Sequence, residues 1–166
     1  YTKEGNEFEA DVRRFFMAQV GKPAGLQYQE AFFERGEGHL SGFGVTPDAR
    51  LYDEEGKSAG LAEFKLKRGK AFNTVLEDYY DQVQLQMAVT GEQVTHLFAL
   101  EQHTDETAHH IIEADPERQE FLIAQANEAK AKAEGMSLGE TQAMMKTIKG
   151  RKAAAAKAVP TIAGEE

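Results

Sequence analysis

The fold is decided by two segments, Thr46-Pro47-Asp48-Ala49-Arg50-Leu51-Tyr52 and Leu61-Ala62-Glu63-Phe64-Lys65-Leu66-Lys67. Side chains of a β-strand point alternately to opposite faces. Glu63, Lys65 and Lys67 therefore share one face of the second segment. The other face carries apolar side chains, which are Ala62, Phe64 and Leu66. The apolar face is expected to pack on a core, and the charged face is expected to point away from it.

Residues 53–57 are polar and contain a glycine, which predicts a hairpin between the two segments. Asp48 follows Pro47 at the start of the first strand, a position where proline is tolerated. The hairpin would bring Asp48 back beside Glu63 and Lys65. Two carboxylates and a lysine on adjacent strands can hold a hard divalent cation and activate a water molecule. The alternative is that these side chains only solvate the wet face of an antiparallel sheet.

Composition limits the kind of protein. The chain has 166 residues, of which 41% are hydrophobic and 28% charged, and we expect one globular domain over residues 1–149 and a flexible, alanine-rich tail over residues 150–166. The formal net charge of -9 argues against general coating by nucleic acid but is compatible with a local basic groove. The absence of cysteine excludes disulfides and thiolate metal sites. No apolar run reaches membrane-spanning length and no signal peptide is recognised, so a cytoplasmic protein without a membrane partner is expected.

Hydrophobic periodicity and end signals predict the remaining elements. Helices are expected over residues 6–20 and 72–90, a strand over 26–33, a glycine-rich loop over 35–44, and a strand pair over 94–100 and 108–114. Asp115-Pro116 starts a helix that runs to residue 134, and Ser137-x-x-Glu140 starts a last short helix. This order predicts an α/β domain with a central mixed sheet flanked by helices.

Two sets of polar side chains lie on the predicted helices. Glu9 lies beside the apolar stripe of the first helix, where it could close a capping box with Asn6 or pair with Arg13. The helix over residues 72–90 carries a polar stripe that is made of Tyr79, Gln82 and Gln86. Such a stripe is normally a wet face, although glutamate and lysine would solvate it better.

A short basic run leaves the strand that carries Glu63 and Lys65. Besides Lys65, the basic side chains of this run are Lys67, Arg68 and Lys70. A charge run is usually a solvated face, but here it stands where a phosphate backbone would need counter-charge. A competing basic run near the C-terminus consists of Lys146, Lys149, Arg151 and Lys152.

Three segments, in order, resemble the phage recombination nucleases of the lambda-exonuclease or YqaJ type, within the PD-(D/E)xK superfamily. They are residues 5–16, the pair Pro47-Asp48 with Glu63-Phe64-Lys65, and residues 79–90 with their Gln-Val-Gln. The resemblance covers roughly residues 5–134. Two features depart from the family: Ala49 stands where glycine is usual, and the connection between Asp48 and Glu63 is longer than expected.

The resemblance implies a restriction-endonuclease-like core and a metal-dependent site. Mg²⁺, with Mn²⁺ as a substitute, would be held by Asp48, Glu63, the backbone carbonyl of Phe64 and, directly or through water, Glu9. Lys65 would position or help deprotonate the attacking water. Tyr79 and Gln82 would orient the nucleophile or hold the phosphate. Lys67, Arg68 and Lys70 would contact DNA.

The function implied by the resemblance is exonucleolytic hydrolysis at double-stranded DNA ends, for recombination or repair. The expected partners are a phage single-strand annealing protein and further copies of the chain in a homo-oligomeric ring, in the cytoplasm of a bacterial host. Two alternatives stay open, which are a repair or defence endonuclease of the same superfamily and an inactive DNA-binding module. The intact Asp48, Glu63 and Lys65 count against the inactive module, because binding alone needs no such set.

Overall fold

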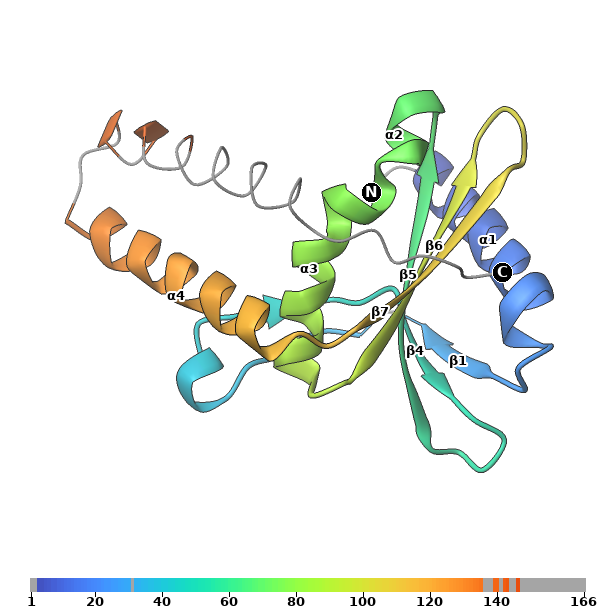
Figure 1. Ribbon diagram of the computed structural model, residues 1–166, viewed down its shortest axis with the longest axis horizontal. Coiled ribbons are helices and arrows are strands. Elements are labelled where there is room, and N and C mark those ends of the chain that lie inside the picture. The colour runs from blue at the N-terminus through green and yellow to red at the C-terminus, as the bar shows by residue number, and fades with distance from the viewer. Residues whose placement is uncertain (1–2, 31, 136–138, 141, 144–145, 147–166) are drawn as a thin grey trace.

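A mixed five-stranded sheet forms the centre of the computed structural model, which describes residues 3–30, 32–135, 139–140, 142–143 and 146 (Figure 1). The strands are β1 (Gln27–Glu30), β4 (Ala49–Tyr52), β5 (Ser58–Lys67), β6 (Val94–Glu101) and β7 (Thr107–Glu113). They lie in the order β1-β4-β5-β6-β7, with β5 and β6 parallel and all other neighbours antiparallel. The predicted α/β fold with a mixed sheet is confirmed.

Helices cover both faces of this sheet. They are α1 (Lys3–Phe16), α2 (Gly69–Asn73), α3 (Val75–Thr90) and α4 (Pro116–Ala133). Together α2 and α3 form the crossover that parallel strands require between β5 and β6. Apolar side chains of α1 pack on one face of the sheet and those of α3 on the other, while α4 lies against α3 (Figure 1).

The layer under α1 confirms the alternation predicted for β5. Phe16 of α1 is fully buried, and its ring centroid lies 5.3 Å from that of Phe64 and 5.5 Å from that of Phe98. Ala62 and Leu66 belong to the same cluster. The charged residues of β5 therefore point to the opposite face of the sheet, which α3 covers.

The predicted hairpin between β4 and β5 is also confirmed. Ala49 lies opposite Ala62, and a β-bulge shifts the register just after Leu51. In the connection, the Asp53 side chain accepts hydrogen bonds from two backbone N–H groups at 2.9 Å. Gly56 adopts a φ of +78°, a left-handed conformation that side chains disfavour.

The helix predicted over residues 72–90 is two helices. The chain already turns helical at Gly69, and the break falls at Thr74, whose hydroxyl donates to the backbone carbonyl of Lys70 at 3.2 Å. Such a local side-chain bond competes with a continuous helix. The predicted end is confirmed, because Gly91 has a φ of +75° and donates its N–H to the last turn.

The N-terminal third differs more from the prediction. The first helix ends as an α-helix at Phe16 and continues as a π-helical turn, Met17–Gly21. The strand expected over residues 26–33 is only β1. The glycine-rich loop contains a small second sheet, β2 (Glu34–Arg35) with β3 (Gly44–Val45), and a 3₁₀ turn. This segment has no clear apolar periodicity, so periodicity could not reveal these short elements.

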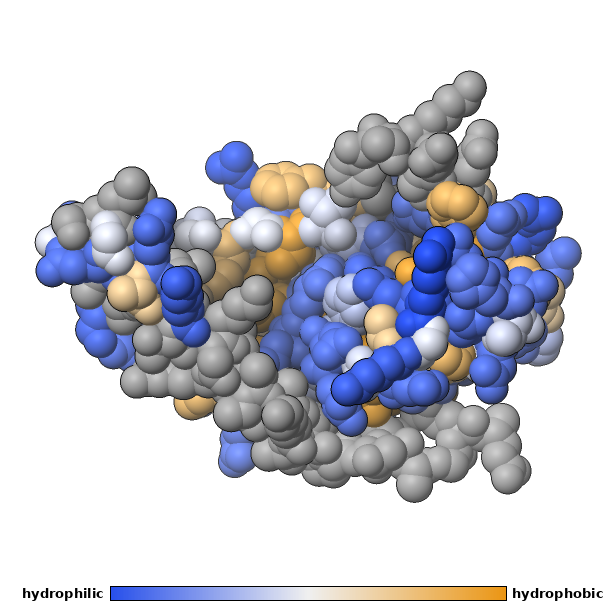
Figure 2. All heavy atoms as spheres, turned by 90° about the horizontal axis from the view of Figure 1, so that it is seen from above, coloured by the Kyte–Doolittle hydropathy of each residue, from blue (hydrophilic) through white to orange (hydrophobic). Residues whose placement is uncertain are grey.

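Figure 2 shows hydrophilic side chains over much of the described surface, with hydrophobic ones in smaller patches and in a hollow. Within the described residues, no helix is both long and apolar enough to span a lipid bilayer. The helix predicted to begin at Ser137 starts outside the described residues, and the tail over residues 150–166 also lies outside them.

Candidate active site

Asp48 and Glu63 are tied together by two hydrogen bonds across the β4–β5 hairpin. The backbone N–H of Phe64 donates to Asp48 Oδ2 at 2.8 Å, and the backbone N–H of Asp48 lies 3.4 Å from Glu63 Oε2. Each carboxylate thus contacts the backbone of the opposite segment. The hairpin register places the two carboxylates side by side, as the sequence predicts.

Burial and charge perturb the Asp48 carboxyl. Loss of solvent is the largest cause and the neighbouring Glu63 the second, and together they raise the pKa of Asp48 from 3.8 to about 6. The Phe64 N–H and the Lys65 ammonium lower this pKa but do not cancel the increase. A divalent cation beside the two side chains would favour the ionised form of Asp48.

This pKa predicts how stability depends on pH in the metal-free protein. Below about pH 4 the carboxyl of Asp48 is protonated in both the folded and the unfolded state. Between about pH 4 and 6 only the folded state keeps the proton, so the free energy of unfolding falls as pH rises. We expect this loss to reach up to about 3 kcal/mol. Urea unfolding in EDTA at several pH values measures it, and Asp48→Asn should remove this component. An identical pH profile for Asp48→Asn would contradict the assignment.

Glu63 is a buried carboxylate surrounded by donors. Its exposed fraction is only 3%, which rules out the solvated-face alternative for this residue. Oε1 lies 3.1 Å from Lys65 Nζ and 3.5 Å from Gln82 Nε2. Oε2 lies 3.4 Å from Gln86 Nε2 and 3.4 Å from the backbone nitrogen of Asp48. A carboxylate is buried this deeply only when other groups compensate its charge.

The ring of Tyr79 on α3 lies beside two lysines of β5. Lys65 Nζ is 4.2 Å and Lys67 Nζ is 4.9 Å from the ring centroid, both within cation–π range. Lys65 is also paired with Glu63, so its ammonium is held by a carboxylate and an aromatic ring. The structure therefore brings together five of the predicted site residues: Asp48, Glu63, Lys65, Tyr79 and Gln82.

Glu9 lies across a groove of about 330 Å³ from Asp48 and Lys65. Partial burial is the largest cause of a raised Glu9 pKa, followed by the charge of Asp48, whereas Arg13 and Lys65 lower it. Arg13 itself pairs with Glu30 at 2.7 Å, which is not the partner expected from helical spacing. The alternative of a capping box between Glu9 and Asn6 is not tested, because the side chain of Asn6 lies outside what the structure describes.

The donor set fits a hard cation such as Mg²⁺. Two adjacent carboxylates supply oxygen ligands, and burial and the charge of Glu63 raise the pKa of Asp48, which a bound cation would counteract. Among the residues that the structure describes, no three His, Cys, Asp or Glu side chains come together as a metal-binding group. The side-chain ligands within reach are thus the pair Asp48 and Glu63, and water and phosphate would complete the shell of a Mg²⁺ ion.

The basic side chains of Lys67, Arg68 and Lys70 do not all lie at the carboxylates. Lys67 lies at Tyr79, next to the carboxylates. Arg68 donates from Nε to Gln102 Oε1 at 2.6 Å, and Lys70 is exposed on the short helix α2. Most of the competing C-terminal run, from residue 147 on, lies outside the described residues.

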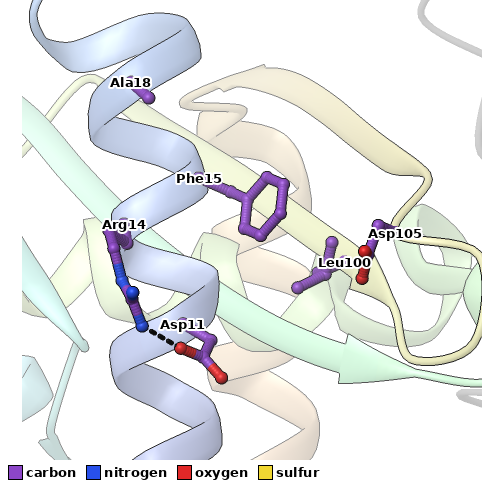
Figure 3. Close-up of a pocket in the computed structure, with 6 residues that line it drawn as sticks. All are labelled: Asp11, Arg14, Phe15, Ala18, Leu100 and Asp105. Atoms are coloured by element: carbon purple, nitrogen blue, oxygen red, sulfur yellow. Dashed lines mark hydrogen bonds and ion pairs between the residues drawn. The ribbon is translucent and has the colours of Figure 1, made fainter.

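A second groove, of about 380 Å³, lies between α1 and the turn that joins β6 to β7 (Figure 3). Its floor is apolar, with Phe15 and Leu100 side by side, and Arg14 pairs with Asp11 at its edge. None of the predicted site residues lines this groove. The cluster of carboxylates and lysines at β5 is therefore the stronger candidate for chemistry.

Gln86 is the contact to Glu63 that the sequence did not assign. It belongs to the polar stripe of α3 and follows Gln82 by four residues, so both point to the same side of the helix. That spacing was the available signal. What the spacing could not show is that this side faces a buried carboxylate instead of solvent.

Comparisons with known proteins support the fold. No protein-family model matches the sequence, and no curated protein matches it. Among solved structures, the alkaline exonuclease LHK-Exo from Laribacter hongkongensis is similar, with 21% identity, a TM-score of 0.54, and coverage of 90% of this chain and 72% of that chain. The same exonuclease in complex with dAMP gives 22% identity and a TM-score of 0.56 at the same coverage. The chain thus shares the mixed α/β fold of this exonuclease structure.

Proposed function

We propose that this protein is a Mg²⁺-dependent deoxyribonuclease that degrades double-stranded DNA from its ends. The observation that carries the proposal is the buried pair Asp48 and Glu63 with Lys65 Nζ at 3.1 Å from Glu63, on the fold of an exonuclease. The dAMP complex of LHK-Exo supports a deoxynucleotide as the class of ligand.

Each residue of the cluster has a role in the proposed reaction. Asp48 and Glu63 would hold Mg²⁺, together with the Phe64 carbonyl and, through water, Glu9. When bound, Mg²⁺ supplies Lewis-acid polarisation of the phosphate and a water of lowered pKa. The Lys65 ammonium is held by Glu63 and Tyr79 at a place where it can orient the attacking water and stabilise charge that develops on the phosphate. Gln82 contacts the same carboxylate and would orient the nucleophile or the phosphate.

We assign DNA binding to the basic side chains of Lys67, Arg68 and Lys70. The chain carries a net charge of -9, so affinity for a phosphate backbone has to come from local positive charge. Lys67 shares the Tyr79 ring with Lys65, which places at least this member of the run beside the proposed site.

Replacing all three of these residues with methionine should weaken DNA binding and flatten its salt dependence. The expected change is about one unit of slope in log K against log salt for each DNA phosphate that the variant no longer neutralises. Salt titrations by fluorescence anisotropy in Ca²⁺ measure the slope. Lys57→Met, at the exposed hairpin tip, is the matched control. An unchanged slope in the triple variant would move the DNA contact elsewhere, with the run over residues 146–152 as the first place to test.

The proposed biological role is production of single-stranded DNA for recombination or repair. Support for this role comes from the sequence resemblance to phage recombination nucleases. The same resemblance implies a single-strand annealing protein as the proposed partner and a homo-oligomeric ring as the proposed assembly. Size-exclusion chromatography with light scattering measures the assembly directly.

The decisive test is a time course on linear and on covalently closed circular plasmid, with Mg²⁺ or with EDTA. An end-dependent exonuclease degrades only the linear form, and only with Mg²⁺. Cutting of the circular form would instead support the endonuclease alternative. Binding to DNA without loss of either form, at any Mg²⁺ concentration, would support an inactive DNA-binding module. Undiminished cleavage in EDTA would refute the metal-dependent mechanism.

A further inference from the structure

Gln86 is buried beside Glu63 and takes no part in the chemistry proposed above. Its exposed fraction is 3%, and its Nε2 lies 3.4 Å from Glu63 Oε2. One helical turn earlier, Gln82 Nε2 lies 3.5 Å from Glu63 Oε1. Two amides from the same side of α3 thus contact the two oxygens of one carboxylate.

The buried amide of Gln86 lowers the stability of the fold. Its other end, Gln86 Oε1, is buried without a hydrogen-bond partner in the described part of the chain. An unsatisfied buried acceptor lowers stability, whereas an apolar side chain of similar volume would leave no polar atom unpaired. The adjacent Met87 and the nearby Val83 show that α3 accepts apolar residues in its buried layer. Contact with Glu63 is the compensating interaction that the structure shows for the Gln86 amide.

We infer that Gln86 is a positioning residue, which fixes the rotation of the Glu63 carboxylate so that its oxygens are presented toward Asp48. The inference rests on the proposed function, in which these two carboxylates hold Mg²⁺. Groups that hydrogen-bond a ligating side chain orient it, and their loss lowers metal affinity about 10–100-fold. The contacts of 3.4 and 3.5 Å are longer than ordinary hydrogen bonds, as is common where a site tightens on binding.

The same helix offers a matched control in Gln84. This residue is fully buried and faces α4 instead of the site. Gln84 Nε2 donates to the backbone carbonyl of Glu113 at 2.8 Å, and its Oε1 accepts from the backbone N–H of Asp115 at 2.9 Å and from Gln119 Nε2 at 3.1 Å. Two buried glutamines, two positions apart, therefore have different tasks. Gln84 joins α3 to the start of α4, and Gln86 orients a carboxylate.

The test measures Mn²⁺ binding without DNA, by electron paramagnetic resonance, for the wild type, Gln86→Met and Gln84→Met. We expect Gln86→Met to raise the Mn²⁺ dissociation constant about 10-fold or more. Gln84→Met should lower the melting temperature and leave the Mn²⁺ affinity unchanged. In cleavage assays Gln86→Met should raise the Mg²⁺ concentration for half-maximal rate, with most of kcat recovered at saturating Mg²⁺. Wild-type Mn²⁺ affinity in Gln86→Met would overturn the inference.

A second measurement separates this inference from the proposed function. If the wild type itself binds no Mn²⁺, the metal-dependent function fails, and the Gln86 contact is judged without metal. Free energies of unfolding in EDTA for Gln86→Met, Glu63→Gln and the double variant give their coupling. Non-additive effects are expected for side chains in direct contact. Additive effects would show that Gln86 only fills space and would overturn the positioning role, whatever the protein binds.

Discussion

Replacing Asp48 or Glu63 with alanine should abolish the proposed Mg²⁺-dependent DNA cleavage, with an expected loss of at least about 10³-fold in kcat. Each substitution removes one of the two side-chain carboxylates that face each other across the β4–β5 hairpin. The Lewis-acid contribution of a bound metal amounts to several kcal/mol, and each 1.4 kcal/mol corresponds to about tenfold in rate. Single-turnover cleavage of an end-labelled duplex is the measurement.

Two controls show that the loss is chemical. Circular dichroism should show the wild-type secondary structure for both variants, because neither Asp48 nor Glu63 belongs to the apolar clusters that hold the helices on the sheet. In the wild type, Ca²⁺ should support DNA binding without turnover, since Ca²⁺ tolerates looser geometry than Mg²⁺. A folded Glu63→Ala variant that cleaves at the wild-type rate would remove Glu63 from the reaction.

Replacing Lys65 with methionine should lower kcat of the proposed reaction by about 10²–10³-fold, while metal and DNA binding are expected to persist. The substitution keeps most of the aliphatic stem and removes the ammonium that lies 3.1 Å from Glu63 Oε1 and 4.2 Å from the Tyr79 ring centroid. If this ammonium stabilises charge that develops on the phosphate, its loss appears in kcat and not in KM. Lys57→Met serves as a control with the same chemical change at an exposed ion pair. Equal rates for Lys65→Met and Lys57→Met would leave Lys65 without a catalytic role.

The arrangement of the carboxylates could be predicted because it follows from local rules. Alternation along β5 assigns Phe64 to the core and Glu63 to the opposite face, and the polar connection over residues 53–57 returns Asp48 to Glu63. Gly91 ends α3 by its left-handed conformation, which glycine adopts at little cost. In each case the deciding interaction lies within a few residues or across one hairpin.

Features that depend on contacts between distant segments could not be predicted in the same way. Alternation tells which face carries Glu63 but not that α3 covers this face, so the burial of Glu63 and its contact with Gln86 were missed. The pairing of Arg13 with Glu30 of β1 replaced the pairing expected along the helix, because Glu30 is brought close only by the sheet. The small sheet of β2 and β3 has two residues in each strand, too few for a periodic signal.

The β4–β5 connection lies at the far end of the hairpin from the carboxylates. Glu63 is five residues beyond the start of β5 at Ser58, which corresponds to about 17 Å of extended strand. The bulge after Leu51 takes up one extra residue before the paired positions Ala49 and Ala62 are reached. An insertion within residues 53–57 should therefore leave the carboxylates in place, at the cost of the local hydrogen bonds of Asp53 and of about 0.6 kcal/mol of loop-closure entropy for each doubling of length. This distance makes the hairpin tip the place to attach a fluorophore without disturbing the site.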